Sequence, residues 1–171
     1  MMKKSRHIQL LPKNGTYDTL ESPVGTLTII TSPEGLHAIL WDNDQDLLTH
    51  FAKDSNEKNI IKTKKQLQEY FNGNRTQFNL PIVLRGTDFQ KQACQQLLNI
   101  PYGHTISYSE QANNLGDKNK ARAVGMANSV NPISIVVPCH RVIGSNNKLV
   151  GFAGGLDKKA YLLELEKSAG V

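Results

Sequence analysis

Two cysteines occur in the 171-residue chain, and Cys139 lies in a sequence that favours reactivity. It follows Pro138 and precedes two basic side chains, His140 and Arg141. Cationic neighbours lower the pKa of a thiol from about 8.5, and the thiolate is the nucleophilic form. This pattern indicates a nucleophilic cysteine next to a base. A buried, inert cysteine would give the same composition, so the motif alone leaves both interpretations open.

The element that leads to Cys139 is expected to be a buried strand over residues 133–137, which are rich in β-branched side chains. Neighbouring residues of a strand point to opposite faces. Cys139 and His140 can therefore interact only if the chain turns there or if a water molecule bridges them.

Residues 151–155 form a glycine-rich loop, and a helix is expected at about 157–167. Such a loop lets backbone N–H groups approach a ligand, but it lacks the Lys-Ser/Thr of a phosphate-binding loop. Glu166 falls in the last turn of the helix, where a carboxylate is mildly disfavoured. The expected core stripe of this helix consists of Leu156, Ala160 and Leu163.

Three helices are expected before the cysteine motif. Thr87 or Asp88 can cap the first, and Ser107 with Glu110 forms a capping box for the second, over residues 108–115. A short turn leads to the third, over residues 118–129. The last two resemble a helix-turn-helix, and one face of the third carries Lys118, Arg122, Gly125 and Ser129.

The positive charge of the chain is concentrated in its second half. The net charge is +5, and residues 85–171 hold ten basic against six acidic side chains. Such a surface suits a polyphosphate partner, although a solvated basic face is the alternative. Between residues 111 and 150, Asp117 opposes five basic side chains: Lys118, Lys120, Arg122, Arg141 and Lys148.

The first half shows no constellation of catalytic residue types. Residues 25–30 and 36–41 predict a hairpin, and residues 60–71 predict a helix that ends near Gly73. Trp41, Tyr70 and Phe71 are expected in a core. We expect a small N-terminal α/β domain with its connector at 1–84 and a separate domain at 85–171, in the α/β (α+β) class.

The composition excludes several protein classes. Two cysteines argue against a disulfide scaffold and a CxxC zinc site. We expect neither a secretory signal nor a membrane span, which needs about 20 apolar residues. A free thiol fits a reducing, cytoplasmic location.

Several segments together resemble one known family, the O6-alkylguanine-DNA alkyltransferases (methylated-DNA–protein-cysteine methyltransferases). The resemblance covers nearly the whole chain, and the segment Pro138–Gly144 with a downstream Gly-Gly-Leu is its most specific part. The other matching segments are 22–25, 67–73, 89–90, 100–103, 106–108, 121–125, 131–132 and 151–156.

The resemblance implies a fold and a chemistry. The N-terminal domain would be RNase H-like, and the C-terminal domain a mostly helical, winged helix-turn-helix-like unit. Cys139 would accept the alkyl group once and irreversibly. His140 would deprotonate it through a water molecule, and Glu166 would orient His140. The resemblance implies no cofactor and no metal.

The resemblance also implies residues that contact DNA and the base. Tyr108 would disturb the target phosphate and donate to N3 of guanine, and Arg122 would fill the place of the flipped base. Lys118 and Ser129 would contact DNA. Substrate contacts would come from Asn131, Val142, Phe152 and Ala153. The implied partner is double-stranded DNA carrying O6-alkylguanine or O4-alkylthymine, bound by a monomer without an obligate protein partner.

Two other function classes stay open from the residues alone. A cysteine hydrolase using Cys139 and His140 would turn over on small esters or peptides. A DNA-binding module without chemistry would bind DNA and remain unmodified, although lesion sensors of this kind lack the acceptor cysteine.

Overall fold

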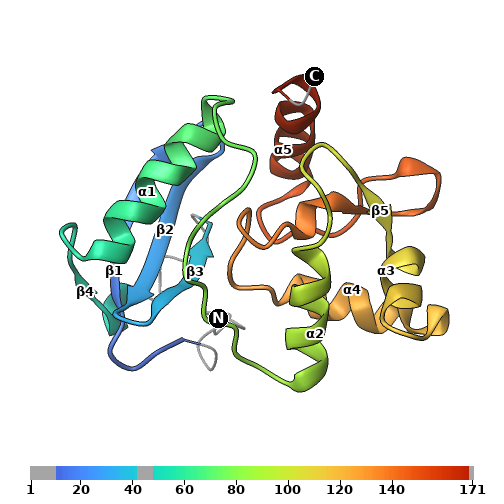
Figure 1. Cartoon of the computed structure of the whole chain (residues 1–171), viewed down its shortest axis with the longest axis horizontal. Coiled ribbons are helices and arrows are strands. Elements are labelled where there is room, and N and C mark those ends of the chain that lie inside the picture. Colours follow the sequence, from blue (N-terminus) through green and yellow to red (C-terminus); the bar gives the residue numbers. More distant parts are fainter. Residues whose placement is uncertain (1–10, 42–47, 170–171) are drawn as a thin grey trace. The chain divides into compact units, whose positions relative to one another are not determined.

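The computed structural model describes residues 11–41 and 48–169. The chain divides into two compact units, with the boundary between Arg85 and Gly86 (Figure 1). Among the described residues, the first unit is a sheet with one α-helix, and the second consists mainly of helices. In the described ranges, no helix combines the length and apolarity needed to cross a membrane.

The sheet of the first unit contains β1 (Thr16–Ser22), β2 (Gly25–Ser32), β3 (Gly35–Leu40) and β4 (Ala52–Lys53) in the order β3-β2-β1-β4. The predicted hairpin is present as β2 and β3, which pair antiparallel. β1 and β4 were not predicted. The hairpin turn requires Gly35, because its φ is 150° and a Cβ would lie 2.3 Å from the Pro81 carbonyl oxygen.

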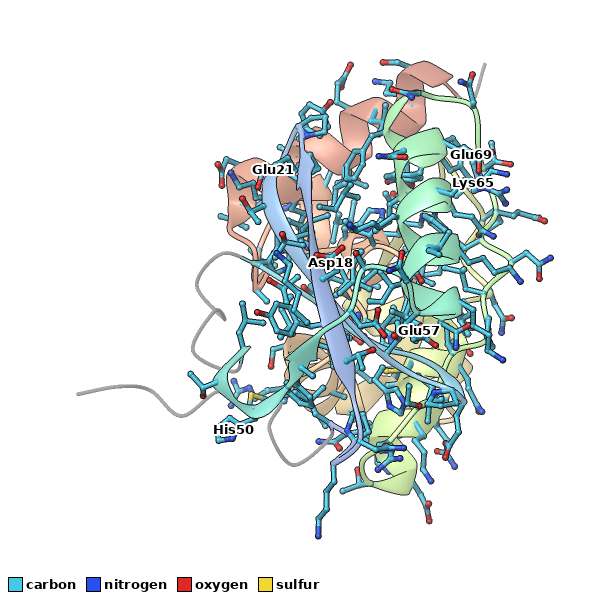
Figure 2. The ribbon with its side chains drawn as sticks, turned by 90° about the vertical axis from the view of Figure 1, so that its left-hand side faces the viewer. Asp18, Glu21, His50, Glu57, Lys65 and Glu69 are labelled. Atoms are coloured by element: carbon cyan, nitrogen blue, oxygen red, sulfur yellow. The ribbon has the colours of Figure 1, made fainter. Side chains whose placement is uncertain are left out.

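Helix α1 (Lys58–Phe71) packs against β1, β2 and β3 (Figure 1). The Glu57 side chain caps it by accepting from the N–H groups of Asn59 and Ile60. Its buried face includes Ile60, Leu67 and Tyr70, which confirms the predicted helix and the core position of Tyr70. Phe71, also expected in the core, is only half-buried. An ion pair between Asp18 of β1 and Lys64 also joins helix and sheet, whereas Lys65 and Glu69 lie on the outer side of α1 (Figure 2).

The second unit begins with α2 (Asp88–Leu97), which Thr87 caps together with Gln90. The predicted capping box of Ser107 and Glu110 is also present, and it starts α3 (Tyr108–Asn114). A short turn and the 3-10 helix η3 (Lys118–Lys120) lead to α4 (Ala121–Ser129), which packs against α2 and α3. α3 and α4 thus have the helix-turn-helix connectivity expected from the sequence.

The remaining elements surround the cysteine motif. They are the 3-10 helix η4 (Cys139–Arg141), β6 (Val142–Ile143), the 3-10 helix η5 (Ser145–Asn147) and α5 (Leu156–Ala169). β6 pairs in parallel with β5 (Ile106–Ser107). This ladder places the start of α3 beside the segment that follows Cys139.

The stripe predicted for α5 is wrong. Leu156 is 48% exposed and Ala160 is exposed, while the side chains that face the core are Lys159, Leu162 and Glu166. Two of these side chains are charged. A prediction from the spacing of apolar residues cannot identify a buried helix face that contains charged residues with polar partners inside the unit.

Candidate active site

Cys139 begins a tight turn. Its N–H donates to the Val137 carbonyl at 2.8 Å, and the N–H of Arg141 donates to the Pro138 carbonyl at 3.0 Å. Residues Cys139–Arg141 form the 3-10 helix η4, with about three residues per turn. Cys139 and His140 therefore do not point to opposite sides as on a strand, and both side chains are buried.

The segment before Cys139 is a buried turn, so the strand predicted for residues 133–137 is wrong. The Asn131 side chain closes it, because Nδ2 donates to the Val137 carbonyl at 2.9 Å and Oδ1 accepts from the Ile133 N–H at 3.0 Å. Ile135 adopts a φ of 74° within the turn. The β-branched residues signalled burial correctly, but the asparagine determines the backbone path. The Asn131 side chain also helps to lower the pKa of the Cys139 thiol.

His140 pairs with Glu166 of α5, with His140 Nε2 2.6 Å from Glu166 Oε2. Burial lowers the pKa of His140, so the ring is neutral at pH 7. An ionised carboxylate only accepts, and Nε2 must therefore carry the ring proton. The lone pair then lies on Nδ1, which is buried and has no hydrogen-bond partner among the described residues. The pair leaves His140 ready to accept a proton at Nδ1.

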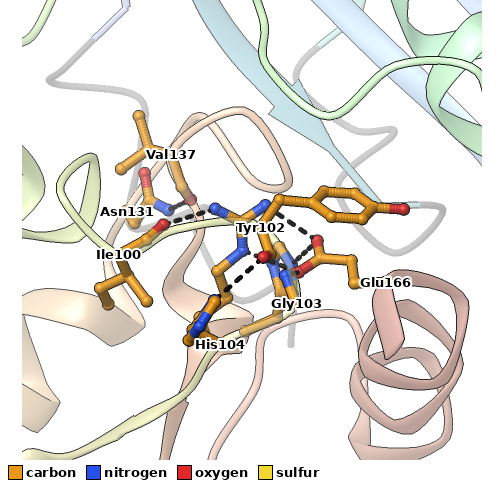
Figure 3. Close-up of polar contacts among 9 residues, drawn as sticks. Ile100, Tyr102, Gly103, His104, Asn131, Val137 and Glu166 are labelled. Carbon is orange, nitrogen blue, oxygen red and sulfur yellow. Dashed lines mark hydrogen bonds and ion pairs between the residues drawn. The ribbon is translucent and has the colours of Figure 1, made fainter. Parts of the chain in front are cut away.

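Arg141 binds the same carboxylate. Its Nε donates to Glu166 Oε1 at 2.7 Å, its Nη2 donates to Oε2 at 3.1 Å, and its Nη1 donates to the Ile100 carbonyl at 2.7 Å. Figure 3 shows these contacts around Glu166 and Ile100. Arg141 is buried, so its assignment to a basic DNA-facing surface was wrong. Burial alone would raise the pKa of Glu166, but His140 and Arg141 hold it at about 2.

The pKa of the Cys139 thiol is subject to opposing effects. Burial raises its pKa, whereas the Asn131 side chain and the positive charge of Lys159 lower it. Cys94 has no such contacts, and burial raises its pKa to about 12. Of the two cysteines, Cys139 is the one with polar groups placed to support a thiolate.

Lys159 of α5 is a site residue that the sequence analysis missed. It is fully buried, and its Nζ donates to the Val142 carbonyl at 2.7 Å and to the Val150 carbonyl at 2.9 Å. Burial lowers the pKa of Lys159, and the charge of Cys139 opposes this. Its spacing with Leu162 and Glu166 is helical and was available in the sequence, but buried lysines are rare.

Tyr108 donates to the Val150 carbonyl, as Lys159 does. As the first residue of α3 it follows β5 directly, and its hydroxyl donates to the Val150 carbonyl at 3.1 Å. The Lys159 Nζ lies 5.8 Å from the Tyr108 ring centroid. The ring also lies beside α4, 3.8 Å from the Cβ position of Gly125. Tyr108 thus links the cysteine site to α4.

The two predicted loop residues, Phe152 and Ala153, make fewer contacts with the cysteine site. Phe152 is half-buried and Ala153 is exposed, and the Gly155 N–H closes a turn on the Phe152 carbonyl at 3.0 Å. No hydrogen bond within the described ranges joins Ala153 to Cys139. The Val142 carbonyl, also predicted to contact the substrate, accepts from Lys159.

The residues predicted to contact DNA lie on η3 and α4. Lys118 and Arg122 are exposed, and the Ser129 hydroxyl donates to the Met126 carbonyl at 2.6 Å. None of the three touches Cys139 in the described structure. They form a second surface, connected to the thiol through Tyr108.

The site contains no evident metal centre. Within residues 11–41 and 48–169, no group of three or more His, Cys, Asp or Glu side chains is arranged to hold a metal ion. The chemistry available from the described residues is a thiol, a neutral imidazole oriented by a carboxylate, and a buried lysine beside the thiol.

Comparison with known proteins gives consistent matches for both units. Residues 16–84 match the family model "6-O-methylguanine DNA methyltransferase, ribonuclease-like domain", and residues 88–168 match "6-O-methylguanine DNA methyltransferase, DNA binding domain". These matches agree with the resemblance and the fold class expected from the sequence.

Individual relatives are similar along most of their length. The methylated-DNA–protein-cysteine methyltransferase of Mycobacterium tuberculosis is 46% identical over 154 residues, covering 89% of this chain and 92% of the relative. That of Methanosarcina acetivorans is 43% identical over 155 residues, covering 89% and 98%. The crystal structure of Mycobacterium tuberculosis OGT in complex with DNA superposes with a TM-score of 0.84 at 45% identity, covering 90% of this chain and 94% of that one.

Proposed function

The chain belongs to the 6-O-methylguanine DNA methyltransferase family, and on that premise we propose that Cys139 accepts the alkyl group from O6 of guanine in DNA. The protein is a methylated-DNA–protein-cysteine methyltransferase that repairs DNA by direct reversal, and DNA is its partner. The observation that carries the role of Cys139 is the neighbouring His140, held by Glu166 with its Nδ1 lone pair unused.

The reaction is a nucleophilic displacement. His140 Nδ1 takes the thiol proton through a bridging water molecule, and the sulfur attacks the alkyl carbon. The S–C bond forms as the C–O6 bond breaks, and the bonding electrons remain on guanine, which is then protonated. Thiol exchange does not cleave the thioether product, so each molecule reacts once. Lys159 and Asn131 stabilise the thiolate before the displacement.

The base must leave the duplex to reach a buried thiol, which costs a few kcal/mol. Arg122, exposed on α4, takes the place of the flipped base in the stack, and Lys118 and Ser129 contact the DNA backbone. Tyr108 lies between α4 and the cysteine site. It turns the target phosphate and donates its hydroxyl hydrogen to guanine N3.

The flipped base is held by backbone groups around the thiol. The carbonyls of Cys139 and Val142 accept from the exocyclic amine of guanine, and the Ala153 N–H donates to O6 as negative charge develops there. Phe152 packs beside the base, and Asn131 couples α4 to the cysteine turn. The same site accommodates O4-alkylthymine, whose reacting oxygen is equivalent. The protein acts as a monomer in the reducing cytoplasm.

A stoichiometry measurement tests this proposal. Duplex DNA carrying a labelled O6-methylguanine is incubated in excess with the protein, and protein-bound label is followed over time. We expect a plateau at one methyl group per molecule and no further reaction. Cys139→Ala should bind the duplex and acquire no label. Continued turnover on DNA or on small esters would instead indicate a hydrolase, and stable binding without label would indicate a non-reactive DNA-binding module.

A further inference from the structure

Met126 is the most exposed of the large apolar side chains in the described ranges, with 63% of its surface accessible. It lies on α4, whose exposed residues are Arg122, Ala123 and Met126. Folding does not explain this position, because Met126 contributes little to the core. A single exposed apolar side chain is common on protein surfaces, so the case for Met126 depends on its place on α4, the helix that we propose meets DNA.

The orientation of α4 is fixed by its opposite face. Val124, Ala127 and Asn128 are buried. The Asn128 side chain donates to Gln111 Oε1 at 2.8 Å, and Gln111 Nε2 donates back to Asn128 Oδ1 at 3.1 Å. Because this amide pair is buried, rotating the helix to hide Met126 would break both hydrogen bonds. Met126 is therefore held outward.

Met126 lies one turn after Arg122, so the two side chains occupy the same strip of the helix. Side chains on a helix lean toward its N-terminus, and Met126 therefore lies over the turn that carries Arg122. The strip is cationic at Arg122 and apolar at Met126, and Lys118 is exposed on η3 just before α4. Cations suit phosphates, whereas an apolar side chain suits sugar edges and base faces.

We propose that Met126 is an apolar wedge that enters the duplex beside Arg122 and helps to unstack the alkylated base. The inference rests on the proposed function, since it assumes that α4 meets the damaged duplex. Proteins that kink DNA insert side chains of this kind between base steps. The flexible thioether of methionine adapts to different neighbours, which suits a protein that must find lesions in any sequence.

Unstacking is measured first, in an unreactive Cys139→Ala background. The probe is a duplex with 2-aminopurine next to O6-methylguanine, because 2-aminopurine fluorescence rises when the base unstacks. Met126→Ala should reduce this rise and weaken duplex binding about 5- to 30-fold, the value of burying most of a methionine side chain. The duplex affinity of Met126→Leu should stay within about twofold of that of the parent. Met126→Gln has a side chain of similar length but polar, and it should bind as weakly as the alanine variant.

Ile61→Ala is the matched control, because Ile61 is 52% exposed on α1 of the first unit and should change nothing. With Cys139 intact, Met126→Ala should slow methyl transfer from the duplex by the same factor and leave transfer from the single strand within about twofold. An unchanged fluorescence rise, or equal losses on duplex and single strand, would overturn the wedge. If the parent protein transfers no methyl group at all, the proposed function fails, and the fluorescence comparison still decides the role of Met126.

Discussion

Replacing Arg141 with methionine should destabilise the protein strongly, because Arg141 is the buried cation that balances Glu166. The substitution keeps an unbranched side chain of similar length but removes the charge and every donor. Glu166 loses the donors at 2.7 and 3.1 Å, and the Ile100 carbonyl loses its donor at 2.7 Å. The carboxylate keeps its contact with His140.

The magnitude follows from the burial of the pair. Removing one partner of a buried ion pair costs about 3–5 kcal/mol, because the other charge stays buried without compensation. For a protein of this size, 1 kcal/mol shifts the melting temperature by about 2–4 °C. We therefore expect Arg141→Met to lower Tm by about 6–20 °C. The pKa of Glu166 should rise in the variant.

Thermal unfolding at pH 7, followed by circular dichroism and calorimetry, measures this effect. The control is Arg122→Met, the same chemical change at an exposed arginine, which should alter stability by less than about 0.5 kcal/mol. The double variant Arg141→Met with Glu166→Gln removes both charges and should recover part of the loss. If Arg141→Met melts within about 2 °C of the control, the buried ion pair does not stabilise the unit as reasoned.

Three further predictions concern the groups around the thiol. His140→Phe should slow methyl transfer by about 10²–10⁴-fold, the usual contribution of a general base. In the unsubstituted protein, the rate of methyl transfer should fall at acidic pH, because His140 becomes protonated below its usual pKa of about 6.5. Lys159→Met removes a cation that faces Cys139, so it should raise the pKa of the thiol, measured from the pH dependence of alkylation by iodoacetamide. The pKa of Glu166 is about 2 in the folded protein, below its usual value of about 4.3. Ionised Glu166 therefore stabilises the fold above about pH 4.3, and this stability is lost as the pH falls toward 2. Acid titrations should show that the free energy of unfolding decreases by about 3 kcal/mol over this range.

Each of these has a distinct contrary result. Transfer by His140→Phe at the original rate would exclude proton removal by the imidazole. An unchanged alkylation profile in Lys159→Met would show that the lysine only supports the Val142 and Val150 carbonyls. Glu166→Gln cannot ionise, so an acid-unfolding curve identical to that of the unsubstituted protein would place the pH dependence elsewhere.

The sequence predicted the elements whose signals are local. The capping boxes at Thr87 and Ser107 and the apolar spacing along α1 arise from neighbouring residues, and the structure contains these features. Such signals need no knowledge of how distant segments meet. The residues adjacent to Cys139 left a reactive and an inert cysteine open, and the acceptor role was implied by the family resemblance.

The remaining features depend on contacts between residues far apart in the chain. Glu166 meets His140 and Arg141 across 25 or more positions, and Lys159 meets Val142 across 17. A charged helix residue is normally exposed, so composition placed Arg141 on the surface and overlooked Lys159. The turn before Cys139 depends on the Asn131 amide bonding to backbone groups on both sides of Ile135. β-propensity, which predicted a strand there, does not include such a side-chain bond.

The most direct test of the central claim is the mass of the protein and of its cysteine peptides after reaction with duplex DNA containing O6-methylguanine under reducing conditions. We expect the intact mass to rise by one methylene group and the whole increment to lie on the peptide that contains Cys139. Cys94, whose pKa burial raises to about 12, should remain unmodified. An unchanged protein mass, or a methyl group on Cys94, would contradict the assignment of Cys139 as the acceptor.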